Sequence, residues 1–269
     1  MNRNVTEPAG KAAEAPLRSL RDLRGLTQAR IALGAHGSGV PTQAALAFNF
    51  DHARAREAVW TAMDADAIRE ALTQQGLDSL AVRSSVTDRA EYLRRPDRGR
   101  TLHADAETAL AAAGSGFDVG IAIADGLSAT AVTLNAVPMA AALAGRIRAA
   151  GLSLAPVVVA SQARVALGDP IGARLGLRCL VMLIGERPGL SAADSLGCYV
   201  TFAPEVGLPD SRRNCISNIR QDGLSIEAAA DQVAGLLRVM FAQGTSGVAL
   251  RREEPPPVLP MSDGGPQSR

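Results

Sequence analysis

Short apolar runs that alternate with helical segments constrain the fold of this chain most strongly. The runs fall at residues 80–82, 119–124, 154–160, 179–184 and 198–202. An apolar run of about four to eight residues bounded by turn residues is typical of a buried strand. Strands separated by helices pair in parallel through right-handed crossovers. The sequence therefore predicts an α/β fold, with a Rossmann-like, mostly parallel sheet flanked by helices.

Capping residues set the expected ends of several helices. Asp88 predicts the start of a helix that Pro96 ends, because an aspartate side chain accepts hydrogen bonds from the first free N–H groups. Asp169 is expected to cap a short helix. Ser225 is expected to cap a final helix that runs to about residue 241.

The pattern of apolar, polar and turn-forming residues divides the chain into four parts. Residues 1–16 lack apolar periodicity and read as a disordered tail, as do the Pro- and Gly-rich residues 251–269. Residues 17–78 are expected to form an N-terminal helical region, in which Thr27 caps a helix through residue 33. Residues 79–250 carry the alternating pattern and form the expected α/β domain.

Charge and hydropathy argue against nucleic acid and membrane as partners. The net charge is +1, so no strongly basic surface that would attract nucleic-acid phosphates is evident. Aromatic residues make up 3% of the chain, so no set of rings on which bases could stack is evident either. No uninterrupted apolar run reaches the roughly 20 residues that span a bilayer. The closest, residues 129–145, is interrupted by Asn135 and Pro138. Residues 135–150 are expected to form a helix with Pro138 in its first turn.

The cysteines indicate a reducing compartment. Cys179 and Cys198 lie in apolar strands and are expected to be inert core residues, whereas polar residues surround Cys215. Three cysteines without CxxC spacing do not suggest a disulfide framework. The first ten residues are polar and no apolar leader follows them, so a cytoplasmic location is expected.

Ligands of open α/β sheets bind outside the carboxyl ends of the strands, and this rule selects particular loops. Three loops follow expected strands, at residues 125–128, 162–165 and 185–190. A fourth polar segment, residues 214–218, lies just before the last helix. Glycines permit close backbone approach to a ligand, and N–H groups at helix starts can donate to it. The loops fit a cofactor cradle, although ordinary strand-to-helix turns use the same residues.

Standard catalytic and metal motifs are missing. The only lysine, Lys11, stands outside any phosphate-binding loop, and no G-x-G-x-x-G or G-x-S-x-G follows a strand. His36, His52 and His103 are scattered and pair with no cysteine at zinc spacing. We therefore expect no catalytic residues and no metal ligands in this chain.

Seven short segments resemble the small (light) subunit of ethanolamine ammonia-lyase, and they occur in the order of that family. They are residues 27–34, 41–42, 51–56, 92–97, 125–128, 185–190 and 215–219. The resemblance covers roughly residues 20 to 249. One departure is that Ala35 and His36 follow Gly34, where many relatives carry an arginine.

The resemblance implies a function and a site. The family's enzyme uses adenosylcobalamin to convert ethanolamine to acetaldehyde and ammonia. Its large subunit holds the catalytic residues, and its small subunit binds cobalamin at the interface between the two. By motif match the cobalamin contacts fall on Val165, Glu186 and Cys215. Some relatives carry a microcompartment-targeting segment in the N-terminal tail, and whether a microcompartment encloses this chain stays open.

Two other functions compete with this interpretation. The first is a stand-alone nucleotide-binding enzyme with a Rossmann-like domain, against which the missing glycine fingerprints argue. The second is a non-catalytic scaffold subunit that works through arginine-bearing helix faces at Arg30, Arg54 and Arg56.

Overall fold

The computed structural model describes residues 22–251 except residues 28 and 36; residues 1–16 and 252–269 of the expected tails lie outside this range. The described residues form two compact units that divide between Ala53 and Arg54, inside helix α1 (Thr42–Trp60). The larger unit holds the sheet and helices α2 to α7, so it contains every loop that the sequence analysis selected.

The described part of the smaller unit is less helical than the sequence predicts. A short 3-10 helix, η1 (Asp22–Gly25), precedes an irregular segment in place of the helix expected from Thr27 to residue 33. Arg24 Nε donates to the Ile31 carbonyl at 3.1 Å, and Ala32 has a φ of 49°. A residue in the left-handed region, such as Ala32, does not continue an α-helix, and the Ile31 carbonyl is already bonded to the Arg24 side chain. Both features interrupt the helical hydrogen-bond ladder. The prediction of that helix is therefore wrong.

Six strands form one sheet with the order β1-β3-β2-β4-β5-β6. They are β1 (Ser79–Arg83), β2 (Val119–Ala124), β3 (Val157–Ser161), β4 (Cys179–Gly185), β5 (Leu196–Phe202) and β6 (Arg213–Ile219). The pairs β1–β3, β3–β2 and β2–β4 are parallel, whereas β5 runs antiparallel to β4 and β6. The prediction of a mostly parallel α/β sheet is confirmed.

The β5–β6 edge of the sheet differs from the prediction in two ways. Residues 186–195 join β4 to β5 without a helix, so β5 returns antiparallel instead of following a crossover. The segment 214–218, expected as a polar loop, lies within β6. There Ile216 and Ile219 are buried, while Cys215 is exposed. A strand that is buried on one face only can carry such a polar sequence.

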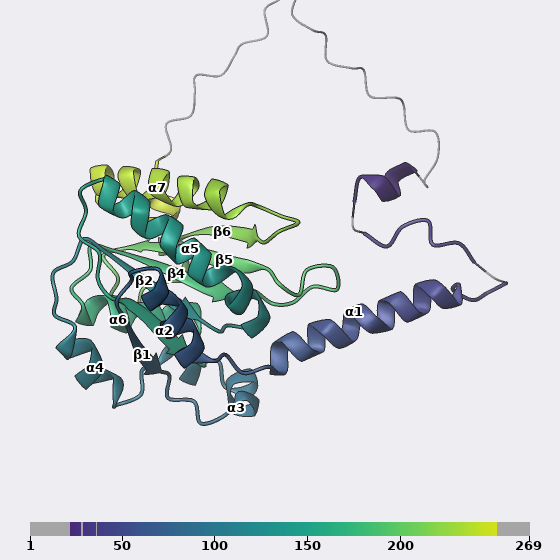
Figure 1. The fold of residues 1–269 in the computed structure, drawn as a ribbon, viewed down its shortest axis with the longest axis horizontal. Helices are drawn as coiled ribbons and strands as arrows, with labels where there is room; N and C mark the ends of the chain where they lie inside the picture. Colours follow the sequence, from purple (N-terminus) through teal and green to yellow (C-terminus); the bar gives the residue numbers. More distant parts are fainter. Residues whose placement is uncertain (1–21, 28, 36, 252–269) are drawn as a thin grey trace, which may run out of the picture. The chain divides into compact units, whose positions relative to one another are not determined.

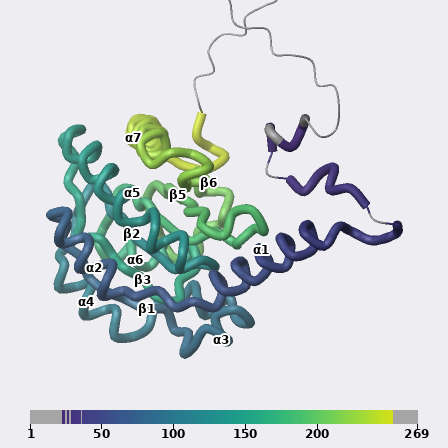
Figure 2. The backbone as a smooth tube through the Cα atoms, turned by 45° about the vertical axis from the view of Figure 1, so that its right-hand side comes forward, coloured from purple at the N-terminus to yellow at the C-terminus, as the bar shows by residue number. Residues whose placement is uncertain are grey.

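Helices cover both faces of the sheet. One face packs against α2 (Ala65–Gln74), α5 (Ala129–Ala149) and α7 (Ile226–Gln243), and the other against α4 (Ala106–Ala112) and α6 (Gly168–Arg174). Figures 1 and 2 show α5 and α7 lying side by side over the sheet. Each face has its own core, built mainly from Ala, Val, Leu and Ile. Short helices occupy the connections: α3 (Arg89–Arg94), η2 (Arg98–Arg100), η3 (Val165–Leu167), η4 (Asp210–Arg212) and η5 (Gly247–Ala249).

The structure confirms two capping predictions and contradicts a third. Asp88 and Ser225 each accept a hydrogen bond from the backbone N–H three residues on, at 2.7 Å and 3.3 Å. Asp169 does not cap α6 but lies inside its first turn. Its carboxylate is buried against the Arg213 guanidinium, which satisfies the charge that a cap would have placed near solvent.

Helix α5 begins earlier than the sequence predicts. The Ser128 hydroxyl accepts from the Ala131 N–H at 3.1 Å, so Pro138 lies in the helix interior and not in its first turn. The missing proline N–H frees the carbonyl of Leu134, a residue 57% exposed, so water can satisfy it. By length and hydropathy α5 could cross a membrane, but 50% of its apolar window is buried inside the fold, as in a core helix.

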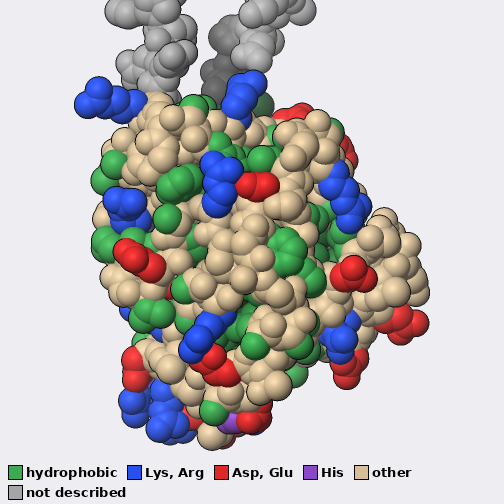
Figure 3. Space-filling model, turned by 90° about the vertical axis from the view of Figure 1, so that its left-hand side faces the viewer, with side chains coloured by type: hydrophobic (Ala, Val, Ile, Leu, Met, Phe, Trp, Pro, Cys, Tyr) green, Lys and Arg blue, Asp and Glu red, His purple; other side chains and the backbone are tan. Residues whose placement is uncertain are grey.

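Charged residues of both signs are mixed on the surface that Figure 3 shows. Arg, Asp and Glu side chains alternate there with hydrophobic ones, and neither sign gathers into a single field. This face therefore lacks the basic stripe that is typical of a nucleic-acid-binding surface.

Candidate functional site

The strand order creates a switch point at the carboxyl ends of β2 and β4. These two strands are neighbours, yet the chain leaves β2 toward β3 and leaves β4 toward β5, in opposite directions across the sheet. In open α/β sheets a crevice opens where neighbouring connections diverge in this way. The loops that the sequence analysis selected surround this point.

The loops after β2 and β4 interlock through two glycines. The Leu127 N–H donates to the Gly185 carbonyl at 3.0 Å. Gly126 has a φ of 55°, and a Cβ there would lie 2.2 Å from the Gly185 oxygen. A Cβ on Gly185 would lie 2.1 Å from the backbone carbonyl oxygen of Ser128. Glycine at both positions lets the two backbones meet, which fixes where the residues after Gly185 emerge.

A buried ion pair holds the β2 loop in place. Asp125 pairs with Arg89 at 3.1 Å and accepts hydrogen bonds from the N–H groups of Gly126 and Ala163, at 3.1 Å and 2.9 Å. Arg89 also donates to the Val59 carbonyl at 2.7 Å. Burial raises the pKa of Asp125, and its hydrogen bonds and Arg89 oppose that rise. The network ties together the end of α1, the start of α3 and the loops that follow β2 and β3.

The connection between β4 and β5 is anchored to α5. The Ser128 hydroxyl donates to the Ala193 carbonyl at 2.7 Å, and the Asn135 amide donates to the Asp194 carbonyl at 2.9 Å. Both donor residues are buried, so these bonds are shielded from water. The anchoring restricts the segment that follows β4.

Two arginines stack on a buried tyrosine beside the loop after β3. The Arg89 and Arg164 guanidiniums lie 4.5 Å and 4.2 Å from the centroid of the Tyr92 ring. The Tyr92 hydroxyl donates to the Ala163 carbonyl at 3.0 Å, and Arg164 Nη2 donates to the Tyr92 carbonyl at 3.1 Å. The Arg164 N–H donates to the Gly99 carbonyl at 2.8 Å. Arg164 is thus held at both its backbone and its side chain.

A hollow of about 460 Å³ opens over these loops, and we call it the Glu186 hollow. Its lining residues come from α3, from the carboxyl ends of β2, β3 and β4 with the loops that follow them, and from the middle of β5: Tyr92, Gly126, Leu127, Arg164, Val165, Ile184, Gly185, Glu186, Arg187 and Tyr199. Two of the three predicted cofactor contacts, Val165 and Glu186, therefore share one concave surface.

The Glu186 carboxylate is positioned by neighbours on β5 and β6. Its Oε2 accepts from the Ser195 hydroxyl at 2.5 Å and from the Asn218 N–H at 3.3 Å. A Cβ on Gly197 would lie 3.0 Å from Glu186 Cγ, so the glycine leaves room for this side chain. Oε1 has no hydrogen-bond partner among the described residues, which leaves a carboxylate oxygen available to a ligand that donates hydrogen bonds.

A second hollow of about 410 Å³ adjoins the first, and we call it the Cys215 hollow. It is lined by Arg100, Arg164, Val165, Ala166, Tyr199, Asp210, Arg213 and Cys215. Arg164, Val165 and Tyr199 line both hollows, so the two adjoin each other. We call this combined surface the rim.

Cys215 and Tyr199 form the β5–β6 side of the rim. They are directly opposite each other in the β5–β6 ladder. Desolvation by the surrounding protein raises the pKa of the Cys215 thiol, and that of Tyr199 to about 12. Both groups are therefore neutral hydrogen-bonding groups near pH 7. Cys179 and Cys198 are buried core residues, as the sequence predicts.

A buried ion pair supports β6 beneath the Cys215 hollow. The Arg213 guanidinium donates to both oxygens of Asp169, at 2.6 Å and 2.8 Å, and both side chains are 3% exposed. Arg213 Nε also donates to Asp210 at 3.3 Å. The bidentate pair fixes the start of β6 against α6, two residues from Cys215.

The structure brings the three predicted site residues to one surface. Val165 lies on the stretch of wall shared by the hollows, Glu186 lines one hollow and Cys215 the other. Sequence reasoning missed Tyr199, which lines both. Its sequence context is that of an ordinary strand residue, and only the pairing of β5 with β6 places it opposite Cys215.

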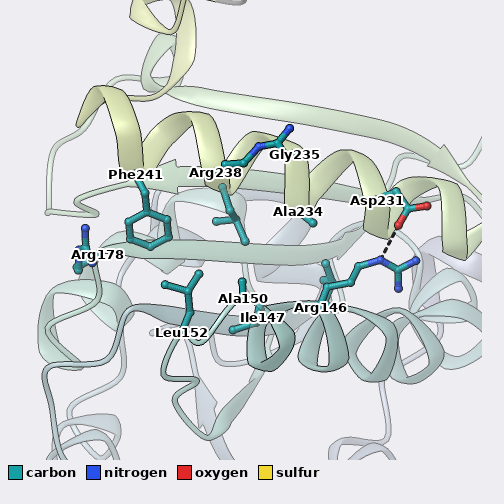
Figure 4. A pocket seen from close by; sticks show the side chains of 12 residues that line it. Arg146, Ile147, Ala150, Leu152, Arg178, Asp231, Ala234, Gly235, Arg238 and Phe241 are labelled. Atoms are coloured by element: carbon teal, nitrogen blue, oxygen red, sulfur yellow. Dashed lines mark hydrogen bonds and ion pairs between the residues drawn. The ribbon is translucent and has the colours of Figure 1, made fainter.

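A larger hollow of about 650 Å³ lies away from the rim, between α5 and α7 (Figure 4). Its lining includes Ile147, Leu152 and Phe241, and Arg146 is paired across it with Asp231 at 2.8 Å. None of the predicted site residues lines it. We therefore assign the candidate site to the rim, where independent loops converge.

Comparison with known proteins decides the family. The family model described as ethanolamine ammonia-lyase light chain matches residues 18–251. The chain belongs to this family. It is 49% identical over 250 residues to the ethanolamine ammonia-lyase small subunit of Azotobacter vinelandii, covering 91% of this chain and 93% of that one. The corresponding subunit of Rhodopseudomonas palustris is 50% identical over 236 residues, covering 87% and 90%.

Membership of the ethanolamine ammonia-lyase light chain family confirms the resemblance seen in the sequence segments. A third relative, the small subunit of Ralstonia nicotianae, is 48% identical over 241 residues, covering 88% of this chain and 89% of its own. The light chain is thus part of an ammonia-lyase complex with a large-subunit partner. The family supports this interpretation and not an independent nucleotide-dependent enzyme.

Proposed function

We propose that this chain binds adenosylcobalamin on its rim, at the interface with the catalytic large subunit of ethanolamine ammonia-lyase. The complex then converts ethanolamine to acetaldehyde and ammonia. In this proposal the light chain holds and shields the cofactor, and the large subunit holds ethanolamine. The convergence of Val165, Glu186 and Cys215 on two adjoining hollows is the observation that supports it.

The chemistry of the rim fits the flank of a corrin. A corrin is a large, mostly apolar ring whose edge carries amide side chains. Val165 and the Tyr199 ring offer apolar contact on the wall that joins the two hollows. The free Glu186 oxygen can accept hydrogen bonds from amide N–H groups, and the neutral Cys215 thiol offers a small polarisable contact. No histidine lines either hollow, so neither hollow would offer an imidazole to the cobalt.

The roles of the residues follow from this division of labour. When bound, adenosylcobalamin supplies radical chemistry by homolysis of its cobalt–carbon bond. The Ser195 and Asn218 contacts fix the Glu186 carboxylate, so that the hydrogen-bond acceptor is pre-oriented. The interlocked glycines Gly126 and Gly185 keep the floor of the rim in place. The light chain therefore contributes binding, orientation and exclusion of water.

Exposed apolar residues of α1 indicate where the large subunit packs. Leu46 and Phe50 are 63% and 64% exposed and lie four residues apart, on one side of the helix. Such a contiguous apolar stripe on a described helix favours burial against a partner chain. We propose that the N-terminal helical region, residues 17–78, contributes to the large-subunit interface, and that the complex resides in the cytoplasm.

A cobalamin titration of the reconstituted complex tests the proposal. The light-chain variants Glu186→Ala and Cys215→Trp, each co-purified with the large subunit, are titrated with cobalamin and followed by absorbance. We expect the apparent Kd to rise by about tenfold or more for each, as when a charge-assisted hydrogen bond or a steric fit is lost. Glu205→Ala, an exposed glutamate after β5 that lines neither hollow, serves as the matched control.

The outcome separates cofactor binding from a scaffold role. If both rim variants assemble with the large subunit and bind cobalamin as the Glu205→Ala control does, the light chain acts as a scaffold and the proposal is wrong. If the purified light chain alone converted ethanolamine, the division of labour between the subunits would be wrong.

A further inference from the structure

Arg164 on the rim carries a charge that no carboxylate among the described residues neutralises, and its side chain is fixed in position. Among the described residues it has no carboxylate within ion-pair distance, although it lines both hollows. Its hydrogen bonds go to backbone carbonyls, and its Nε is buried without any partner. A guanidinium in this state is favourable for an anion that can bring acceptor oxygens to it.

We propose that Arg164, together with Arg100, forms an anion subsite for the phosphodiester in the nucleotide arm of the cobalamin. This inference rests on the proposed function and names the part of the cofactor that lies against the Cys215 hollow. The subsite is distinct from Glu186, which accepts hydrogen bonds and would repel a phosphate.

Arg164 is pre-organised for this role. Its guanidinium lies 4.2 Å from the centroid of the buried Tyr92 ring, and Nη2 donates to the Tyr92 carbonyl at 3.1 Å. The backbone N–H of Arg164 donates to the Gly99 carbonyl, and a Cβ at Gly99 would lie 2.8 Å from Arg164 Cγ. Stacking and tight packing leave the side chain little rotamer freedom, so little entropy is lost when an anion binds.

The charges around the Cys215 hollow favour a single negative charge. Arg213 is offset by Asp169 and Asp210, with N–O distances of 2.6 Å and 3.3 Å. Arg100 and Arg164 line the same hollow, and neither forms an ion pair among the described residues. The three arginines outnumber the two aspartates by one, which matches the single charge of a phosphodiester.

Two arginines that line the groove between α5 and α7 form ion pairs with carboxylates, unlike Arg164. There Arg146 donates to Asp231 at 2.8 Å (Figure 4) and to Glu227 at 2.7 Å. Arg178, at the other end of that groove, pairs with Asp118 at 2.8 Å. Arg164 contrasts with both, because its contacts are a tyrosine ring and backbone carbonyls.

A comparison of two corrinoids tests the subsite. Cyanocobalamin carries the phosphodiester, whereas dicyanocobinamide lacks the nucleotide arm. Each is titrated into the complex of light and large subunits, with wild-type light chain and with Arg164→Met, which retains much of the packing on Tyr92. We expect Arg164→Met to raise the Kd for cyanocobalamin about tenfold and that for dicyanocobinamide less than about twofold. Arg164→Lys should lose less, because it keeps the charge without the fork.

Two further variants guard against a folding artefact. Arg100→Met should show the same selectivity with a smaller effect, because Arg100 is exposed. Arg174→Met, an exposed arginine of α6 that lines neither hollow, should change neither Kd. Equal losses for the two corrinoids, or no loss for either, in both the Arg164 and Arg100 variants would overturn the subsite. Normal binding by Glu186→Ala and Cys215→Trp would instead overturn the proposed function.

Discussion

Tyr199 on β5 and Cys215 on β6 lie directly opposite each other in the antiparallel ladder, and both line the Cys215 hollow. Side chains directly opposite in such a ladder project from the same face of the sheet. This pair places a ring and a thiol beside Val165, so the antiparallel edge of the sheet completes a site whose other half comes from parallel strands. The remaining expectations concern how that site is held together and how it responds to change.

The thiol of Cys215 should react slowly with alkylating agents at neutral pH. Desolvation raises its pKa, so the thiolate fraction at pH 7 to 8 is smaller than for a free cysteine of pKa about 8.5, and it grows as pH rises. Labelling by iodoacetamide, followed by mass spectrometry from pH 7 to 10, measures this. Cys179, whose burial raises its pKa to about 12, provides an internal control that should stay unlabelled. Labelling that is complete at pH 7 within the time a free thiol needs would contradict it.

The glycines that interlock the rim loops should not tolerate a side chain. Alanine at Gly185 would place a Cβ 2.1 Å from the Ser128 oxygen, and the overpacked backbone should lower the free energy of unfolding by about 2–3 kcal/mol or more. Chemical denaturation measures the change. Gly145, in α5, gives the matched control, because a Cβ at that position would have nothing within 4 Å. Gly145→Ala should stabilise the protein by about 0.5–1 kcal/mol; equal effects of the two substitutions would refute the steric argument.

The pair of Arg213 and Asp169 should show strong coupling. Removing Asp169 alone leaves a guanidinium that is 3% exposed without its main partner, so Asp169→Leu should lower the free energy of unfolding by about 3–5 kcal/mol. The double variant with Arg213→Met should lose less than the single one, because no unpaired charge remains. Glu107→Gln, in an exposed pair with Arg174, should change stability by less than about 1 kcal/mol. If the loss of unfolding free energy in the double variant equals the sum of the losses in the two single variants, the coupling is contradicted.

Gly99 should control the position of Arg164. A Cβ there would lie 2.8 Å from Arg164 Cγ and 3.3 Å from the Tyr92 ring, so Gly99→Ala should displace the guanidinium. If Arg164 binds the phosphodiester, this variant should weaken cyanocobalamin binding by several-fold, about 3 to 10 times, and leave dicyanocobinamide nearly unaffected. Gly145→Ala again serves as the control. Unchanged discrimination between the two corrinoids would show that the position of Arg164 does not matter.

Much of the fold could be predicted from the sequence because its signals are local. The apolar runs at β1 to β4 are bounded by turn residues, and capping side chains such as Asp88 act on N–H groups three residues away. The sheet edge could not be predicted in this way. Cys215 lies in a segment that also holds Asn214, Ser217 and Asn218, and its strand identity depends on pairing with β5, which is a tertiary interaction.

The candidate site was predictable in part for the same reason. Glu186 directly follows β4 and Val165 lies in the loop after β3, where the switch-point rule applies, and the family resemblance pointed to them and to Cys215. Two features were beyond sequence reasoning. Asp169 looks like a helix cap until Arg213 is found beside it, and Arg164 looks like any surface arginine until its missing carboxylate partner is evident.

The structure of the complex of light and large subunits with cobalamin bound tests the central claim most directly. The account predicts that atoms of the corrin or its side chains lie within about 4 Å of Val165, Glu186 and Cys215 together. A cobalamin bound with the rim turned away from it, or with those three residues in contact only with the large subunit, would contradict the account.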